Sequence, residues 1–153
     1  EPSGYRALEL LYSQFRSIVP PPMVKGVPDY SPEVMTRQYA ELKALKSRLR
    51  AIDDSNWPIS QRVDYMVVLA EMRGFDFQHR VLQPWKRDPA FYSTTNLGFG
   101  PKMHGAIAIP DLPLDQFEAA ELAARLDAVP EALRQARDNL TDARGDLARL
   151  AIA

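Results

Sequence analysis

Hydrophobic positions recur at helical spacing through most of the chain and mark four long amphipathic segments. In residues 4–19, 31–52 and 60–83 the apolar side chains are three or four residues apart. A fourth such pattern covers 115–150 and is divided near Pro130. Proline and turn-forming residues separate these segments, because proline lacks the amide hydrogen that a helix interior needs. The pattern therefore predicts an all-α fold of five or six helices.

The apolar stripes also predict which face of each helix is buried. The stripe of the third segment consists of Val63, Met66, Val67, Ala70, Gly74, Phe77 and Val81. Since glycine destabilises a helix interior by about 1 kcal/mol relative to alanine, we expect another helix to cross closely at Gly74. In the last segment Leu126 and Leu133 are expected to point inward. Pro130 is expected to interrupt that helix and to begin a new one.

A proline- and glycine-rich segment, Pro84 to Pro113, separates the third and fourth predicted helices. It contains five prolines and three glycines, so we expect a short helical turn around 88–92 followed by irregular chain. An irregular segment of this length within a compact domain is usually functional or covers something.

Aromatic and cationic side chains of this segment are the candidate ligand-binding residues. They are Trp85, Arg87, Tyr92 and His104. The hypothesis is that Trp85 and Tyr92 anchor the segment, whereas Arg87 and His104 meet an anionic or polar ligand at the wall of a substrate cleft. The alternative is that the aromatic side chains only attach the segment to the helices and that Arg87 pairs with Asp88 or a helix C-terminus.

Composition excludes several classes of protein. The 153 residues are 46% hydrophobic and 25% charged, which is typical of one folded domain, and the net charge of −1 argues against a nucleic-acid binder. The absence of cysteine excludes disulfides, thiolate metal sites and cysteine nucleophiles. No apolar run approaches the roughly 18 residues of a membrane span.

The residues that usually carry chemistry do not form a recognisable set. His79 and His104 are far apart, and neither belongs to a motif that places two ligands one helical turn apart. We therefore expect no metal or cofactor in this chain, and a structural or solvated role for His79. Because no nucleophile and base occur at a familiar spacing, the catalytic residues, if there are any, stay unknown.

Several segments, in their order along the chain, resemble one large bacterial family. They are Tyr12–Arg16, Val27–Glu33, Leu49–Asp53, Arg62–Met66, Trp85–Tyr92 and Leu122–Leu126. In these segments the chain resembles the N-terminal region of the domain of unknown function 885 family. The resemblance implies a helical protein several times longer, often with a signal or lipoprotein leader. Its C-terminal half is similar to zinc-dependent metallopeptidases.

This resemblance implies that residues 1–153 are a single helical domain and the N-terminal part of a longer protein. The domain would form a cleft wall of a metal-dependent hydrolase or peptidase-like protein without being catalytic alone, and zinc would belong only to a C-terminal half. The expected partners are that half or a partner chain, a homodimer included, in the periplasm or another extracytoplasmic compartment. Two alternatives stay open: a self-contained helical protein-interaction module, and a short enzyme with a chemistry of its own.

Overall fold

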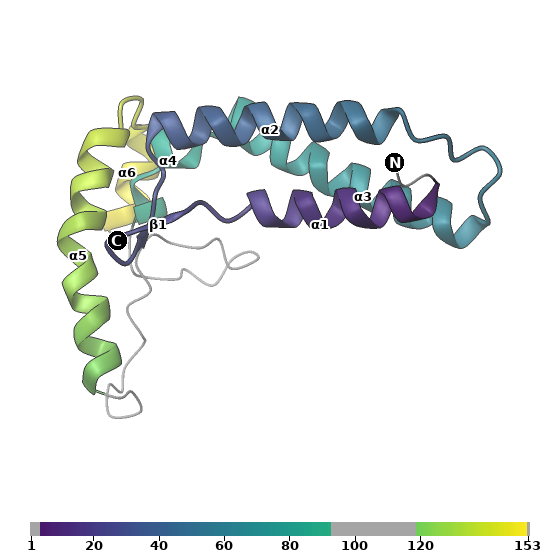
Figure 1. Ribbon diagram of the computed structural model, residues 1–153. Helices are drawn as coiled ribbons and strands as arrows, with labels where there is room; N and C mark the ends of the chain where they lie inside the picture. Colours follow the sequence, from purple (N-terminus) through teal and green to yellow (C-terminus); the bar gives the residue numbers. More distant parts are fainter. Residues whose placement is uncertain (1–3, 93–118, 153) are drawn as a thin grey trace. The chain divides into compact units, whose positions relative to one another are not determined.

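The computed structural model describes residues 4–92 and 119–152, and the chain divides into two compact units. The first unit comprises residues 1–21 and 33–82, and the second comprises 22–32 and 83–153. The all-α prediction is confirmed, because the regular structure of the described residues is helical apart from one very short hairpin (Figure 1). The expectation of one domain stays a prediction, since units of this size also occur within single domains.

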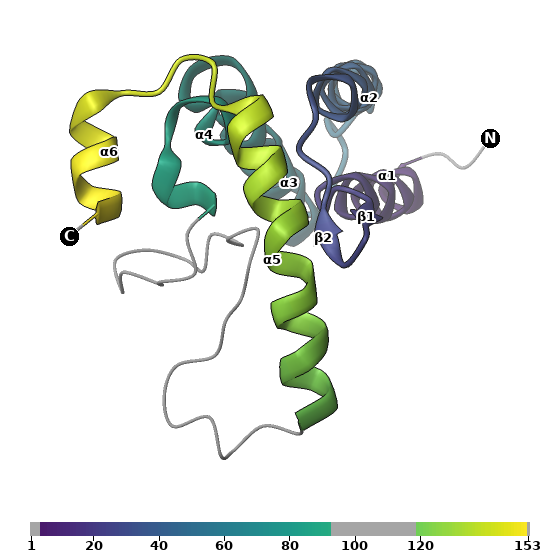
Figure 2. The ribbon, with the colours of Figure 1, turned by 90° about the vertical axis from the view of Figure 1, so that its left-hand side faces the viewer.

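Three long helices build the first unit. They are α1 (Tyr5–Ile18), α2 (Pro32–Arg50) and α3 (Ile59–Phe77), and a π-helical turn, η1 (Gln78–Leu82), continues α3 directly. Figures 1 and 2 both show the three helices running alongside one another. Helix α2 begins at Pro32, which lacks the amide hydrogen that would have no intrahelical partner there, and Glu33 in the first turn lies at the positive end of the helix dipole.

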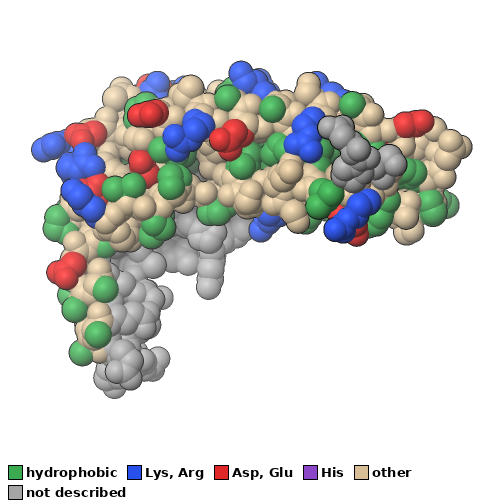
Figure 3. Space-filling view, viewed as in Figure 1, with side chains coloured by type: hydrophobic (Ala, Val, Ile, Leu, Met, Phe, Trp, Pro, Cys, Tyr) green, Lys and Arg blue, Asp and Glu red, His purple; other side chains and the backbone are tan. Residues whose placement is uncertain are grey.

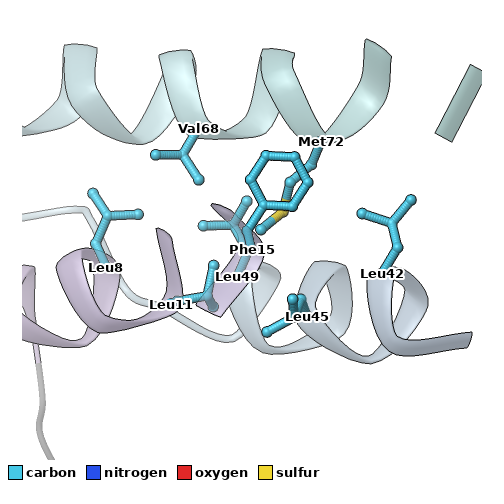
Figure 4. Close-up of a cluster of buried hydrophobic side chains, with 8 residues drawn as sticks. All are labelled: Leu8, Leu11, Phe15, Leu42, Leu45, Leu49, Val68 and Met72. Carbon is cyan, nitrogen blue, oxygen red and sulfur yellow. The ribbon is translucent and has the colours of Figure 1, made fainter. Parts of the chain in front are cut away.

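The core of the first unit lies between these three helices. Eight buried side chains point toward one another in Figure 4: Leu8, Leu11 and Phe15 of α1, Leu42, Leu45 and Leu49 of α2, and Val68 and Met72 of α3. Their three- and four-residue spacing places each set on one face of its helix. Truncating such a leucine to alanine costs about 2–5 kcal/mol, so this cluster accounts for much of the stability of the unit.

The face of α3 that packs into this core is not the one that the sequence predicts. Tyr65, Val68, Leu69, Met72 and Phe75 face the other two helices, whereas the predicted stripe is exposed. Both faces of α3 are apolar, so periodicity alone cannot distinguish them. In the fold the face with Val68 and Met72 meets the apolar stripes of α1 and α2.

The second unit combines a hairpin with short helices. Strands β1 (Met23–Val24) and β2 (Val27–Pro28) pair antiparallel, and Lys25 and Gly26 between them both have positive φ angles, of 49° and 81°. A two-residue hairpin turn of this kind matches the twist of the strands, and glycine adopts it without strain. The helices are α4 (Pro84–Arg87), the 3₁₀-helix η2 (Pro89–Tyr92), α5 (Ala119–Asn139) and α6 (Gly145–Ile152).

Helix α5 corrects two expectations. It runs unbroken through Pro130, as Figure 2 shows, although the sequence predicts an interruption there. Both Pro130 and Leu126, whose carbonyl the proline cannot bond, are exposed, so water can hydrate that carbonyl. Leu126 and Leu133 also point outward rather than inward, because the small side chains of Ala128 and Ala132 form the packed face.

Candidate interaction surface

The most prominent surface feature of the first unit is an apolar face on α3 and η1. We define the α3 apolar face as Ile59, Val63, Met66, Val67, Ala70, Gly74, Phe77 and Val81, all of them exposed. A helix normally turns an apolar stripe toward a covering layer. Helices α1 and α2 cover one stripe of α3, and none of the described residues of the first unit covers the other.

A hollow lies at the N-terminal end of this face. It has a volume of about 380 Å³, is open to solvent, and is lined by Ile59, Val63, Met66, Val67 and Ala70, with Asp54 and Arg62 at its edge. The lining is almost entirely apolar. Such a hollow suits an inserted apolar side chain better than a charged ligand.

Gly74 lies in the middle of the face, and its surroundings correct the expected close crossing. A Cβ atom added at this position would meet nothing within 4 Å. No helix of the first unit therefore crosses α3 at Gly74. The glycine instead leaves a flat place on an exposed apolar surface, where another backbone could approach closely.

Charged side chains beside the face bind within their own unit. Arg62 faces Asp54 with an Nε–Oδ2 distance of 3.8 Å, and Asp64 accepts a 2.7 Å hydrogen bond from the hydroxyl of Tyr5. Arg16 and Glu71 form a further pair at 3.4 Å. These pairs are exposed and contribute little stability. Because the charged side chains contact one another, they do not lie over the α3 apolar face.

A second candidate is a buried polar cluster where α3 passes into η1. The amide nitrogen of Gln38 donates hydrogen bonds to the carbonyls of Ile18 (2.6 Å) and Val19 (3.1 Å), at the end of α1. The Gln38 oxygen must then accept, and it lies 2.9 Å from Nε2 of His79. This geometry places the ring proton of neutral His79 on Nε2.

The surroundings of His79 favour its neutral form. The ring is buried and stacks on the ring of Tyr39, with 5.6 Å between the ring centroids. The ring of Phe75 meets it edge-on, with 4.7 Å between the centroids. Burial lowers the pKa of His79 below its ordinary value of 6.5, although the nearby Asp76 carboxylate opposes this shift. We interpret the cluster as a support for the π-helical turn, because its polar groups bind one another rather than an open cavity.

Asp76 completes this end of the first unit. Burial alone would raise its pKa, but hydrogen bonds from Arg80 (2.9 Å) and Lys46 (3.2 Å) outweigh burial and hold the pKa below its ordinary value. The carboxylate is therefore ionised and doubly paired. It links α2 to the junction of α3 and η1.

Two of the four residues predicted from the sequence, Trp85 and Tyr92, contact each other in the second unit. Tyr92 is buried, donates a 2.8 Å hydrogen bond to the carbonyl of Trp85, and accepts one of 3.0 Å from the amide of Asn139. Burial raises the pKa of Tyr92, so its hydroxyl stays protonated. Trp85 is half-buried. Most of the segment from Pro84 to Pro113 lies outside the described residues, so the anchoring role of Trp85 and Tyr92 stays a prediction.

The other two predicted residues have different outcomes. The Nε of Arg87 binds Oδ2 of Asp142 at 2.8 Å, and the backbone carbonyls of Lys86 and Arg87 accept hydrogen bonds from the amides of Asp142 and Arg144. Arg87 thus forms an ion pair, but with the segment between α5 and α6 rather than with its sequence neighbour. His104 lies outside the described residues. The structure therefore does not test whether these two side chains share a ligand.

The described residues contain no group of three or more histidine, aspartate or glutamate side chains that could hold a metal ion. No helix in ranges 4–92 and 119–152 is long and apolar enough to cross a membrane. On the side of the molecule shown in Figure 3, basic and acidic side chains alternate without a large field of one sign.

No protein-family model matches the chain, and no curated protein or solved structure matches it. The site must therefore be judged on its own chemistry. The α3 apolar face is the candidate site, because it is an exposed apolar surface with a hollow at one end. The sequence pattern identifies most of its residues but predicts that they are buried.

Proposed function

We propose that this chain is a non-catalytic helical module that binds another protein surface through the α3 apolar face. The observation that carries the proposal is the exposure of eight consecutive positions of one helical stripe, next to an apolar hollow. Contiguous apolar patches larger than a few hundred Å² are uncommon on proteins that work alone, and usually mark interaction sites.

The resemblance to the domain of unknown function 885 family gives this proposal a more specific form. In that form the bound surface belongs to the C-terminal half of a metal-dependent hydrolase, and the chain contributes structure rather than catalytic groups. Zinc, peptidase activity and an extracytoplasmic location would then be properties of the longer protein. The exposed face supports this form equally well, because a neighbouring half needs an apolar contact surface.

A second proposal concerns the segment Trp85–Tyr92 as a cleft wall. What supports it is the rigid attachment of this segment through Tyr92, Asn139 and the Arg87–Asp142 pair. An ordered segment of this kind can hold an aromatic side chain and cations at a fixed place. In this proposal Trp85, Arg87, Tyr92 and His104 contribute to the substrate side of the cleft.

The test of the interaction proposal compares two charged variants by gel filtration of extracts of the native host. Val67→Lys places a charge on the α3 apolar face, and Leu10→Lys places one at an exposed apolar position of α1. We expect the wild type and Leu10→Lys to elute in a complex, and Val67→Lys to elute as the free protein. Identical elution of all three proteins would contradict the proposal.

A further inference from the structure

One side chain of α2 holds both segments through which the chain leaves the first unit. Gln38 donates hydrogen bonds to the carbonyls of Ile18 (2.6 Å) and Val19 (3.1 Å), shortly before the chain enters the second unit at residue 22. Its oxygen lies 2.9 Å from Nε2 of His79 in η1, shortly before the chain enters the second unit again at residue 83. We define these four groups, the two side chains and the two carbonyls, as the Gln38 latch.

The π-helical turn η1 has one buried attachment. All five of its residues are described, and among them only His79 is buried, whereas Val81 and Leu82 are 41% and 49% exposed. Opening the turn therefore moves a single buried side chain into water and exposes little new apolar surface. Segments with few buried apolar contacts open at a lower free energy than the core unfolds.

Gln38 couples this turn to the end of α1. Its side chain is buried, so departure of His79 would leave the Gln38 oxygen without that hydrogen bond in a buried place, which costs free energy. A Gln38 side chain that turns toward water to recover a partner gives up the carbonyls of Ile18 and Val19. The last carbonyls of a helix have no intrahelical partners, so the end of α1 then frays.

The charges beside the latch disfavour a protonated His79 while the latch is closed. They come from three elements: Asp76 of α3, Arg80 of η1, and Lys43 and Lys46 of α2. Among these four groups the one carboxylate, Asp76, already binds two of the cations, at 2.9 and 3.2 Å. The third, Lys43, lies 5.0 Å from the centroid of the Tyr39 ring, on which His79 stacks. A charged imidazole would thus be a further cation in a buried site, and only Asp76 and the negative end of the α1 dipole would favour it.

We propose that the Gln38 latch is an acid-sensitive switch: uptake of a proton by His79 opens η1 and, through Gln38, releases the end of α1, while the core of the first unit stays folded. In the open turn the ring is in water and titrates near its ordinary pKa of 6.5. The open fraction therefore rises below that pH, by at most about tenfold per pH unit, because one proton is taken up. The switch needs no partner at the α3 apolar face, so it is tested separately from the proposed function.

Amide hydrogen exchange of the purified full chain at pH 7.5, 6.5 and 5.5 tests the switch. Each measured rate is compared with the intrinsic rate at the same pH, and the ratio is the protection factor. We expect amides of η1 and of the last turn of α1 to be less protected than those of Leu45 and Leu49 at every pH. From pH 7.5 to 5.5 their protection should fall by up to about tenfold. Asp76 stays ionised in this range, since its pKa lies below 3.8.

Three variants assign the response. His79→Gln should abolish the fall in protection of both segments, and His104→Gln, the matched control, should keep it. Gln38→Met removes both sets of hydrogen bonds with a side chain of similar length. In this variant the end of α1 should be poorly protected at every pH, whereas η1 should still respond to acid.

Three results would each overturn the proposal. Equal protection of η1 and of Leu45 would mean that the turn opens only when the whole unit unfolds. A response that persists in His79→Gln would belong to another group. An end of α1 that still follows pH in Gln38→Met would show that Gln38 does not transmit the opening.

Discussion

Gln38 sets the tautomer of neutral His79, and burial disfavours the protonated ring. The amide nitrogen of Gln38 donates to the carbonyls of Ile18 and Val19, so its oxygen can only accept a hydrogen bond from the imidazole. A protonated ring would keep this hydrogen bond but would place a charge in a buried site beside Tyr39 and Phe75. The folded first unit therefore prefers neutral His79.

We predict that acid destabilises the protein through His79. The pKa of His79 is lowered in the folded state, so the unfolded chain takes up the proton first as the pH falls through about 6.5. Stability is therefore complete above that pH, declines below it, and levels off below the folded pKa. The paired Asp76 loses its contribution only at much lower pH, because its ordinary pKa of 3.8 is itself lowered.

Melting temperatures measured from about pH 7.5 to about pH 5 check this prediction. The wild type should lose melting temperature over this interval, and His79→Gln should lose distinctly less. His104→Gln is the control for the other histidine and should behave like the wild type. Parallel pH profiles for the wild type and His79→Gln would show that His79 is not the responsible group.

The Arg87–Asp142 pair allows the cleft-wall proposal to be tested separately. Both partners are partly exposed, so we expect Arg87→Ala and Asp142→Asn to cost a similar and small amount, about 0.2–1 kcal/mol, in denaturant unfolding. If Arg87 also meets a substrate, Arg87→Ala should additionally reduce activity of the longest native form, whereas Asp142→Asn should reduce it less. Equal effects of both variants on activity would leave Arg87 with a structural role alone.

At the scale of elements, the two apolar stripes of α3 differ in exposure, which the sequence pattern does not predict. Val67 is 51% exposed and its neighbour Val68 is 6% exposed, so adjacent valines lie on opposite faces of one helix. We predict that Val67→Lys leaves the melting temperature nearly unchanged, since surface changes are usually within about 0.5 kcal/mol. Val68→Lys should unfold the first unit, because it buries a charge in the core. Similar melting curves for both variants would contradict the assigned faces.

Gly74 gives a second test of the same element. In dilute solution Gly74→Ala should raise stability by about 0.5–1 kcal/mol, because alanine is the better helix former and the added methyl group meets no neighbour within 4 Å. Thermal or chemical unfolding measures the difference. A destabilised variant would mean that another part of the protein packs against Gly74 after all.

The sequence predicts the helices of this chain better than their faces. The start of α2 at Pro32 follows from local chemistry, since proline at the first helical position is recognisable without tertiary structure. The buried faces of α3 and α5 depend on which neighbours are present, so Val63 and Leu133 are assigned inward by pattern and are exposed in the fold. The Gln38–His79 contact joins residues 41 positions apart, and no local signal predicts it.

The candidate ligand residues show the same limit. Aromatic content suggests that Tyr92 packs against the rest of the protein, and its ring is buried with a partner for its hydroxyl. The partner of Arg87 is Asp142, 55 residues away, which composition alone cannot identify. Long-range pairs of this kind are set by the fold as a whole.

At the scale of the whole molecule, the chain forms two compact units, one of which presents an unusually apolar surface. The core of the first unit satisfies α1, α2 and one side of α3, so the exposed side of α3 adds nothing to folding. An exposed apolar face of this kind favours association with other proteins, and such faces usually mark sites where association is part of the function. The central claim is therefore that this face is open in the isolated chain and covered in the working protein.

Methionine oxidation by hydrogen peroxide tests this claim most directly, because the first unit carries its own buried reference residue. Met66 on the α3 apolar face is 58% exposed and Met72 in the core is 0% exposed, while Met23 of the hairpin is 64% exposed. In dilute purified protein we predict that Met66 and Met23 are oxidised at similar rates and that Met72 is protected. In the native extract Met66 should become protected while Met23 stays reactive. Oxidation of Met66 at the same rate as Met23 under both conditions would contradict the account.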